Sequence, residues 1–111
     1  MKPNELFSLE NKTAVVTGAL GLLGKNHCRA LSEAGAKVIV TDLDEKKCIE
    51  FSKTLCPGSM GIGADITDPD SVKNLCSVIL HNLNQIDILV NNAAINDIFV
   101  PKDSSGENPA A

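Results

Sequence analysis

The chain has 111 residues, enough for one domain around a single core, and its hydrophobic content of 43% is that of a globular protein. A formal net charge of −4, with the Lys and Arg residues scattered along the chain, argues against a nucleic-acid partner. No apolar run reaches the roughly 18 residues that a membrane span needs, so we expect no membrane partner either.

The first predicted elements are a strand and a helix. Residues 13–18 (TAVVTG) form a short β-branched run that stops at a glycine, which is typical of a buried strand. A helical pattern follows from Leu22 to a stop at Gly35, and its spacing puts Leu23, Ala30, Leu31 and Ala34 near one face.

The same alternation is predicted again in the next segment. Residues 37–42 (KVIVTD) predict a second strand, and either Asp42 or Asp44 is expected to cap the helix behind it. That helix ends before Pro57, and residues 58–66 predict a weak third strand.

A third helix and a fourth strand complete the pattern. Thr67 or Asp68 is expected to cap the helix, and Pro69 occupies a first position where its missing N–H does no harm. The helix then carries the clearest apolar stripe in the chain, formed by Val72, Leu75, Cys76, Ile79, Leu80 and Leu83. Residues 86–92 (IDILVNN) predict the last strand.

This order of elements predicts an α/β fold. Strands joined by crossover helices run parallel, with helices on both faces of the sheet, so the chain forms half of a doubly wound fold. We expect residues 1–100 to form this half-domain and residues 101–111, which are polar and rich in Pro, Gly and Ser, to form a loop or tail.

Three evenly spaced glycines follow the first predicted strand. Gly18, Gly21 and Gly24 fall where a strand turns into a helix, and glycines at such a turn let a pyrophosphate approach the free N–H groups of the helix. Their spacing is GxxGxxG and not the generic GxGxxG. The alternative is that they only punctuate a turn between a strand and a helix.

Asp42 strengthens the nucleotide interpretation. It ends the second predicted strand about 20 residues past the turn, where a carboxylate accepts hydrogen bonds from the adenosine ribose. An acid there repels a 2′-phosphate, so NAD is favoured over NADP, although Lys46 and Lys47 follow closely. The alternative is that Asp42 only caps the next helix.

Cysteine and histidine residues offer no second site. The four cysteines include no CxxC pair, and the N-terminus lacks a secretory apolar segment, so reduced thiols and a cytoplasmic location are expected. His27 and His81 have no carboxylate or cysteine at metal-ligand spacing, and we predict no metal site.

With TGALGLLG, DLD, GADITD and DILVNNAAI placed in order, the chain resembles the short-chain dehydrogenase/reductase family from about residue 12 to residue 95. The resemblance implies a partial Rossmann fold with strand order 3-2-1-4. It also implies that the turn holds the pyrophosphate of a nicotinamide dinucleotide, through Gly18, Gly21, Leu22 and Leu23.

The resemblance assigns the rest of the cofactor as well. Asp42 would bind the adenosine ribose, and Asp65 with Ile66 would meet the adenine ring. Asn91 and Ala93 would lie beside the ribose of the nicotinamide.

Two motifs depart from the family's usual pattern. Classical members carry TGxxxGxG, whereas Leu22 stands where their middle glycine would be and Gly21 comes one residue early, as in extended members and in some classical-length members, so the pattern leaves the subgroup open. The usual NNAG reads NNAA here, with Ala94 in place of glycine.

The family's catalytic residues have no counterpart in the sequence. Its hydride transfer depends on a Tyr and a Lys in a YxxxK motif and on a Ser upstream of it, and this chain contains no tyrosine. Lys102 and Ser104 fall upstream of where that site would begin, so we assign no catalytic residue and expect the chain alone to be inactive.

The resemblance further implies an N-terminal part that stops before the fifth strand of the family. Residues 86–92 would then form an exposed sheet edge, which predicts association with another chain. The leading hypothesis is the cofactor-binding half of an NAD-dependent oxidoreductase acting on an alcohol or carbonyl. The alternatives are a non-catalytic product that binds nucleotide or a partner chain, and a flavodoxin-like nucleotide binder, against which Asp42 and NNAA argue.

Overall fold

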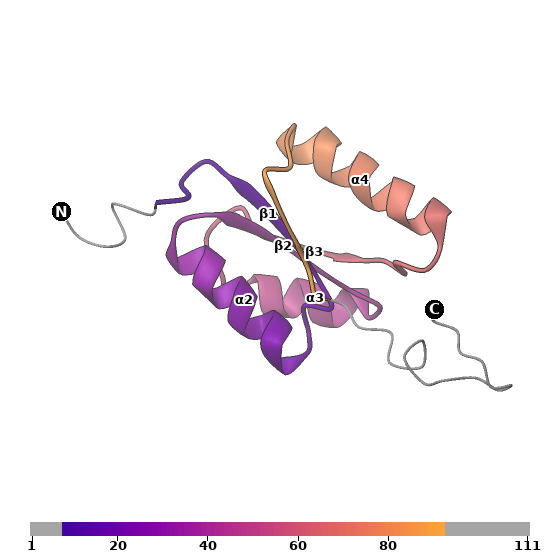
Figure 1. Ribbon diagram of the computed structural model, residues 1–111, viewed down its shortest axis with the longest axis horizontal. Coiled ribbons are helices and arrows are strands. Elements are labelled where there is room, and N and C mark those ends of the chain that lie inside the picture. Colours follow the sequence, from indigo (N-terminus) through magenta and orange to yellow (C-terminus); the bar gives the residue numbers. More distant parts are fainter. Residues whose placement is uncertain (1–7, 93–111) are drawn as a thin grey trace, which may run out of the picture.

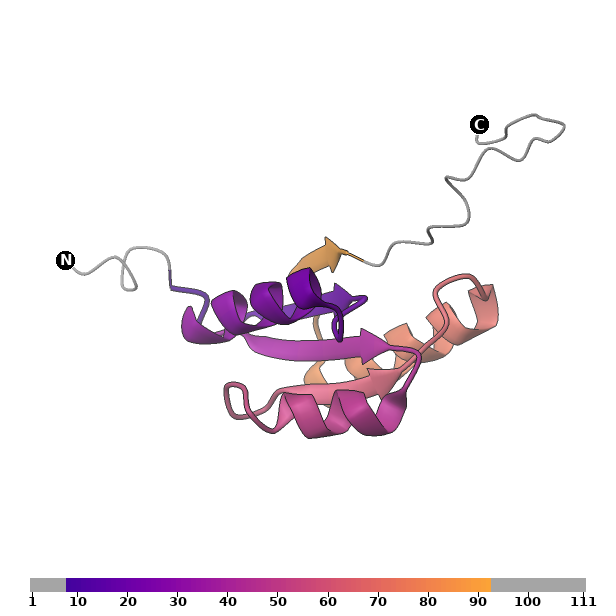
Figure 2. The same cartoon turned by 90° about the horizontal axis from the view of Figure 1, so that it is seen from below.

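A four-stranded parallel sheet organises the structure, a computed structural model that describes residues 8–92. Its strands are β1 (Thr13–Thr17), β2 (Lys37–Asp42), β3 (Met60–Gly63) and β4 (Ile88–Asn91). Their order is β3-β2-β1-β4, and Figure 2 shows β3 and β4 at the two ends of the sheet. The predicted partial Rossmann fold with order 3-2-1-4 is confirmed. The predicted tail at 101–111 lies outside the described residues.

Three helices cover the sheet in the described part of the chain. They are α2 (Leu22–Glu33), α3 (Glu45–Ser52) and α4 (Pro69–Leu83). Figure 1 shows α2 and α3 on one face of the sheet and α4 on the other. None of these helices has the length and apolar character that crossing a bilayer requires.

The helix starts follow from local sequence. Asp44, and not Asp42, caps α3 by accepting a hydrogen bond from the Lys47 N–H at 3.1 Å. Asp68 caps α4 in the same way, with Pro69 directly behind it. Both caps satisfy N–H groups that a helix start leaves without a partner.

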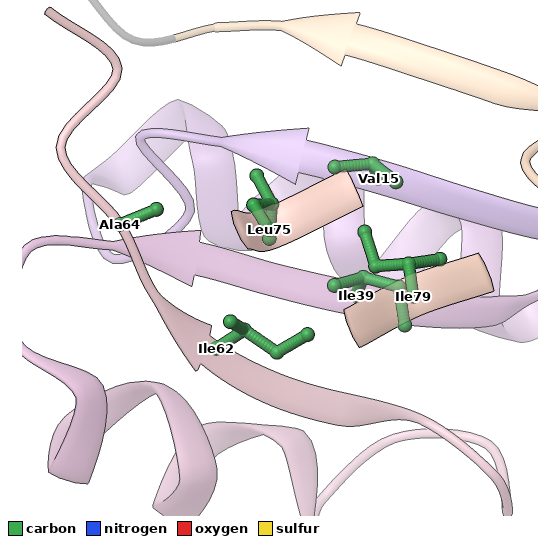
Figure 3. Packing of buried hydrophobic residues seen from close by; sticks show 6 residues of the cluster. All are labelled: Val15, Ile39, Ile62, Ala64, Leu75 and Ile79. Atoms are coloured by element: carbon green, nitrogen blue, oxygen red, sulfur yellow. The ribbon is translucent and has the colours of Figure 1, made fainter. Parts of the chain in front are cut away.

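The core is aliphatic and divides into two layers. On the α4 face, Leu75 and Ile79 pack against side chains from three strands, and Figure 3 shows Ile79 beside Ile39. The opposite layer, beneath α2 and α3, is formed by Val16, Ala19, Cys28, Val38, Val40 and Cys48. Alternate residues of β1 and β2 thus serve opposite faces, as strand geometry requires.

The expected apolar face of α2 is confirmed only in part. Leu31 packs against the core, but Leu23 and Ala30 are exposed, and the buried residues of this helix are Gly24 and Cys28. A β-carbon on Gly24 would lie 2.2 Å from the Gly18 carbonyl oxygen, so the backbone of α2 rests directly on the turn. This close approach sets the rotation of the helix.

Glycine also explains why β3 looked weak in the sequence. A β-carbon on Gly61 would lie 2.3 Å from the Cys48 carbonyl carbon, so α3 packs directly against the backbone of β3. The Gly63 N–H then donates to the Glu45 carboxylate at 3.1 Å. The strand therefore contains glycine to bring the helix close, at a cost in strand propensity.

Asp87 fixes the start of β4 against β1. Its carboxylate accepts from the Thr13 N–H at 2.9 Å, and its own N–H donates to the Thr13 carbonyl at 2.9 Å. The Gln85 side chain donates to the same carboxylate at 2.6 Å. The Thr13 N–H lowers the pKa of Asp87 below its ordinary value, with Gln85 and Lys12 acting in the same direction. These bonds set the register of the edge strand.

Candidate functional site

The carboxyl ends of the strands bring the predicted site residues to one edge of the sheet. Thr17 of β1 lies in register with Thr41 of β2 and with Asn91 of β4, and Asp42 lies in register with Gly63 of β3. The residues that follow these positions therefore face the same crevice, where ligands of open α/β sheets bind.

The turn after β1 is held by backbone bonds. Gly18 has a φ of +61°, a left-handed conformation that favours glycine. Its carbonyl accepts from the Gly21 N–H at 3.3 Å, and the Ala19 N–H donates to the Thr41 carbonyl at 3.1 Å. The turn is thus fixed to the end of β2 as well as to itself.

Asn92 holds the turn from the other side. Its side-chain amide donates to the Gly18 carbonyl at 3.1 Å, which connects the end of β4 to the turn. Asn92 is not among the residues predicted for the site, which include Asn91 and Ala93; the second Asn of NNAA is the sequence signal for it. Asn91 accepts from the Thr17 hydroxyl at 3.3 Å, and Ala93 lies outside the described residues.

Gly21 differs from the other two glycines of the turn. Its φ of −74° and ψ of 171° are open to any residue, and an added β-carbon would meet only the Gly18 oxygen at an ordinary 3.6 Å. Gly18 needs its positive φ, and Gly24 needs its close contact, but neither conformation nor packing requires glycine at position 21, where its advantage over alanine is that of a helix N-cap. A ligand passing over the turn supplies a stronger reason.

The start of α2 presents unpaired backbone donors. The first bond across the helix start runs from the Lys25 N–H to the Gly21 carbonyl, at 2.9 Å. Within residues 8–92, the N–H groups of Leu22, Leu23 and Gly24 have no acceptor, and no side chain caps the helix. These donors and the helix dipole together favour an anion at this position. Leu22 is 80% exposed, so the helix start is open to solvent.

Asp42 is fixed by two backbone donors. One carboxylate oxygen accepts from the Leu20 N–H at 3.0 Å, and the other accepts from the Leu43 N–H at 2.8 Å. The alternative reading, a cap for α3, does not hold because Asp44 has that role. Each oxygen keeps a second lone pair that can accept a hydroxyl.

Cys48 lies beneath Asp42 and is fully buried. Burial first, and then the Asp42 charge, raise the pKa of its thiol to about 11. The thiol is therefore neutral at ordinary pH and acts as a core side chain.

Asp65 organises its own turn after β3. One carboxylate oxygen accepts from the Thr67 hydroxyl at 2.6 Å and from the Thr67 N–H at 2.9 Å, and these bonds lower the pKa of the carboxyl group. The Ala64 N–H donates to the Asp42 carbonyl at 3.0 Å, which puts this turn beside the end of β2. Ile66 is half-buried there. The two residues assigned to adenine therefore reach the same edge as Asp42.

Two other features contribute nothing to this site. A cavity of about 340 Å³ lies between α2 and α3 and includes Arg29 and Phe51 in its lining, but it contains no predicted site residue. Among the residues that the structure describes, no group of three His, Cys, Asp or Glu side chains is placed to hold a metal ion.

Comparison with known proteins identifies the family. The profile of the short chain dehydrogenase family matches residues 12–108. The chain belongs to this family. The short-chain dehydrogenases that it resembles include the short chain dehydrogenase/reductase dpmpG of Macrophomina phaseolina, 37% identical over 87% of this chain. Galactitol 2-dehydrogenase of Agrobacterium fabrum is 34% identical over 81% of the chain, and the 3-oxoacyl-[acyl-carrier-protein] reductase FabG of Vibrio cholerae is 39% identical over 80%.

The match covers only part of each relative. The chain spans 58% of the Macrophomina protein, 35% of the Agrobacterium dehydrogenase and 36% of the Vibrio reductase. The family uses a nicotinamide dinucleotide, and the crevice described above lies within the matched part of the chain.

Proposed function

We propose that this chain forms the cofactor-binding part of an NAD-dependent short-chain oxidoreductase. Gly18, Gly21, Leu22 and Leu23 hold the pyrophosphate. Asp42 binds the adenosine ribose, Asp65 and Ile66 contact adenine, and Asn91 and Ala93 flank the ribose of the nicotinamide. The intact enzyme would transfer hydride between the cofactor and an alcohol or carbonyl substrate.

The observation that carries the proposal is the open start of α2. Three consecutive N–H groups are unpaired in the described part of the chain, and they follow a glycine that neither backbone conformation nor packing requires. Family membership supplies the ligand that fits such a place, since two phosphates of a dinucleotide accept hydrogen bonds from these donors.

A proline at position 22 tests this assignment. Leu22 is the first residue of α2, where proline is tolerated because the N–H has no helical partner, and the extended backbone of Gly21 suits a following proline. Leu22→Pro removes one phosphate donor, whereas Leu22→Ala removes the same side chain and keeps the N–H. A fluorescence titration with NADH should show binding by wild type and by Leu22→Ala within about twofold of each other. Leu22→Pro should bind at least about tenfold more weakly, the cost of one hydrogen bond to a charged acceptor.

Two results of this titration contradict the proposal. One is wild-type protein that does not bind NADH, and the other is a folded Leu22→Pro variant that binds as well as Leu22→Ala. A circular dichroism spectrum of each variant shows whether the helix has formed.

The proposed preference for NAD rests on Asp42. Its carboxylate is held at the end of β2 by two N–H groups, and these bonds oppose its movement away from a 2′-phosphate. Lys46 and Lys47 are exposed on the first turn of α3, where they would soften the discrimination.

Turnover is a separate matter from binding. The sequence contains no tyrosine, and resemblance to the family assigns the proton-transfer role to a tyrosine. We therefore propose that the 111-residue chain alone binds the cofactor and does not turn over an alcohol. For the intact enzyme we propose an alcohol or a carbonyl compound as substrate, with no narrower class.

Self-association is proposed from the edge of the sheet. In the described part of the chain, β4 pairs only with β1, and Leu89 on this strand is 64% exposed. An edge strand with an exposed apolar side chain is a site for pairing with a second chain. A cytoplasmic location is also proposed, supported by four cysteines that are all free thiols.

A further inference from the structure

We propose that Asp42 is a positioning residue for the phosphate site, in addition to its role toward the ribose. Its carboxylate accepts from the Leu20 N–H at 3.0 Å, and Leu20 belongs to the turn between β1 and α2. The carboxylate therefore holds the conformation of the turn from which the phosphate donors project. This inference rests on the proposed nucleotide site and deepens it.

The anchoring of the turn shows why this one bond matters. The Ala19 N–H is bound to β2 by the Thr41 carbonyl, and the Gly18 carbonyl is bound to β4 by Asn92. Leu20 is the next residue along the turn, and its N–H is held by the charged side chain of Asp42. Hydrogen bonds to charged acceptors are stronger than neutral ones.

The carboxylate itself is well fixed. The Leu43 N–H holds its second oxygen at 2.8 Å, so the side chain is clamped between β2 and the turn. Loss of this side chain would free the Leu20 N–H and let the turn sample other conformations. The free N–H groups at Leu22 and Leu23 would then be less well oriented toward a phosphate.

The negative charge of Asp42 makes the two possible effects of its removal on phosphate binding opposite in direction. Asp42 is an anion close to a site for anions, so its removal should by electrostatics alone strengthen the binding of a phosphate ligand. If Asp42 positions the turn, its removal should instead weaken that binding. A ligand without a ribose separates this effect from direct recognition of the ribose hydroxyls.

The experiment is a titration of the full chain with inorganic pyrophosphate, followed through the amide signals of Leu22, Leu23 and Gly24 by NMR. Asp42→Ala should bind pyrophosphate about tenfold more weakly than wild type, and Asp42→Asn, which keeps one acceptor oxygen, should fall between them. The matched control is Asp44→Asn, which removes a charge two residues away and does not contact the turn; its affinity should stay within about twofold of wild type.

Hydrogen exchange of the Leu20 amide gives a second readout. We expect protection in wild type and in Asp44→Asn and a loss of protection in Asp42→Ala. If Asp42→Ala does not fold, the nearly isosteric Asp42→Asn decides the outcome by the same two measurements.

Three results would overturn the inference. They are pyrophosphate affinity that is unchanged or increased without the Asp42 carboxylate, a Leu20 amide that exchanges freely in wild type, and a wild-type turn that does not respond to pyrophosphate. A parallel NADH titration separates the two proposals. If wild type binds NADH and one of these results is found, only the positioning role fails; if wild type does not bind NADH, the proposed function fails.

Discussion

Alanine at two neighbouring glycines should separate binding from folding. Gly21 and Gly24 lie three residues apart at the start of α2, yet the fold treats them differently. An added β-carbon at Gly21 meets one oxygen at 3.6 Å, whereas one at Gly24 lies 2.2 Å from the Gly18 oxygen and 2.8 Å from the Ala19 Cα. The same substitution therefore tests two different properties.

The stability effects follow from these contacts. At Gly24 the helix must move by roughly 1 Å to restore ordinary contact, and such overpacking costs about 1–3 kcal/mol or more. At Gly21 alanine is a poorer N-cap than glycine but restricts the unfolded chain, and the two effects offset each other to within about 1 kcal/mol. Thermal unfolding followed by circular dichroism should show a large decrease in Tm for Gly24→Ala and a small change for Gly21→Ala.

The binding effects should run the other way. Gly21→Ala puts a methyl group where the proposed pyrophosphate passes, so NADH affinity should fall at least about tenfold, or about 1.4 kcal/mol, in a protein that remains folded. Two findings would refute this reasoning. The first is a Gly21→Ala protein that binds NADH as wild type does, and the second is a Gly24→Ala protein that melts at the wild-type temperature.

Three further predictions concern stability and association. Because folding lowers the pKa of Asp87, its carboxylate stabilises the protein above the unfolded pKa of about 3.9, and this stabilisation is lost as the pH falls through the folded pKa. Asp87→Asn should therefore flatten the fall of Tm below about pH 4. An unchanged dependence of Tm on pH would contradict the role of the bond between Asp87 and β1. The Thr41 hydroxyl is buried with no hydrogen-bond partner in the described structure, so Thr41→Val should raise the free energy of unfolding by about 1 kcal/mol in a urea titration, and destabilisation would show that the hydroxyl is satisfied. Leu89→Lys should shift the protein toward monomer in sedimentation velocity at high concentration, and identical profiles for both proteins would remove the edge strand as the association site.

Much of the fold could be predicted from sequence because its signals are local. The strands are β-branched runs, and the cap of α4 is an Asp followed by a proline, so each is specified within a few residues. The strand order came from the resemblance and was confirmed. The positions of Gly18, Asp42 and Asn91 at one edge follow from that order alone, since parallel strands bring their carboxyl ends together.

The rotation of α2 could not be predicted in the same way. Hydrophobic periodicity puts Leu23 and Ala30 on one face with Leu31, which does pack against the core. The helix nevertheless leaves Leu23 and Ala30 exposed and turns Gly24 and Cys28 inward, because only glycine allows the contact with Gly18. That contact is tertiary, and it overrides a weak apolar pattern. The two side-chain bonds that hold the turn are equally non-local, since Asp42 lies 22 residues from its partner Leu20 and Asn92 lies 74 residues from its partner in the chain.

The double role of Asp42 also changes what a cofactor switch should do. Asp42→Arg supplies a cation for a 2′-phosphate, but it also removes the acceptor of the Leu20 N–H. We therefore expect affinity for NADH to fall by more than affinity for NADPH rises, so that the preference shifts toward NADPH while total binding weakens. Leu43 offers a comparison, because it is the next residue and its side chain is 74% exposed. Leu43→Arg adds the same guanidinium group but keeps the Asp42 carboxylate and its bond to the turn, so it should raise NADPH affinity with little loss for NADH. If titrations of both cofactors show equal and opposite changes for Asp42→Arg, the carboxylate acts on the ribose alone.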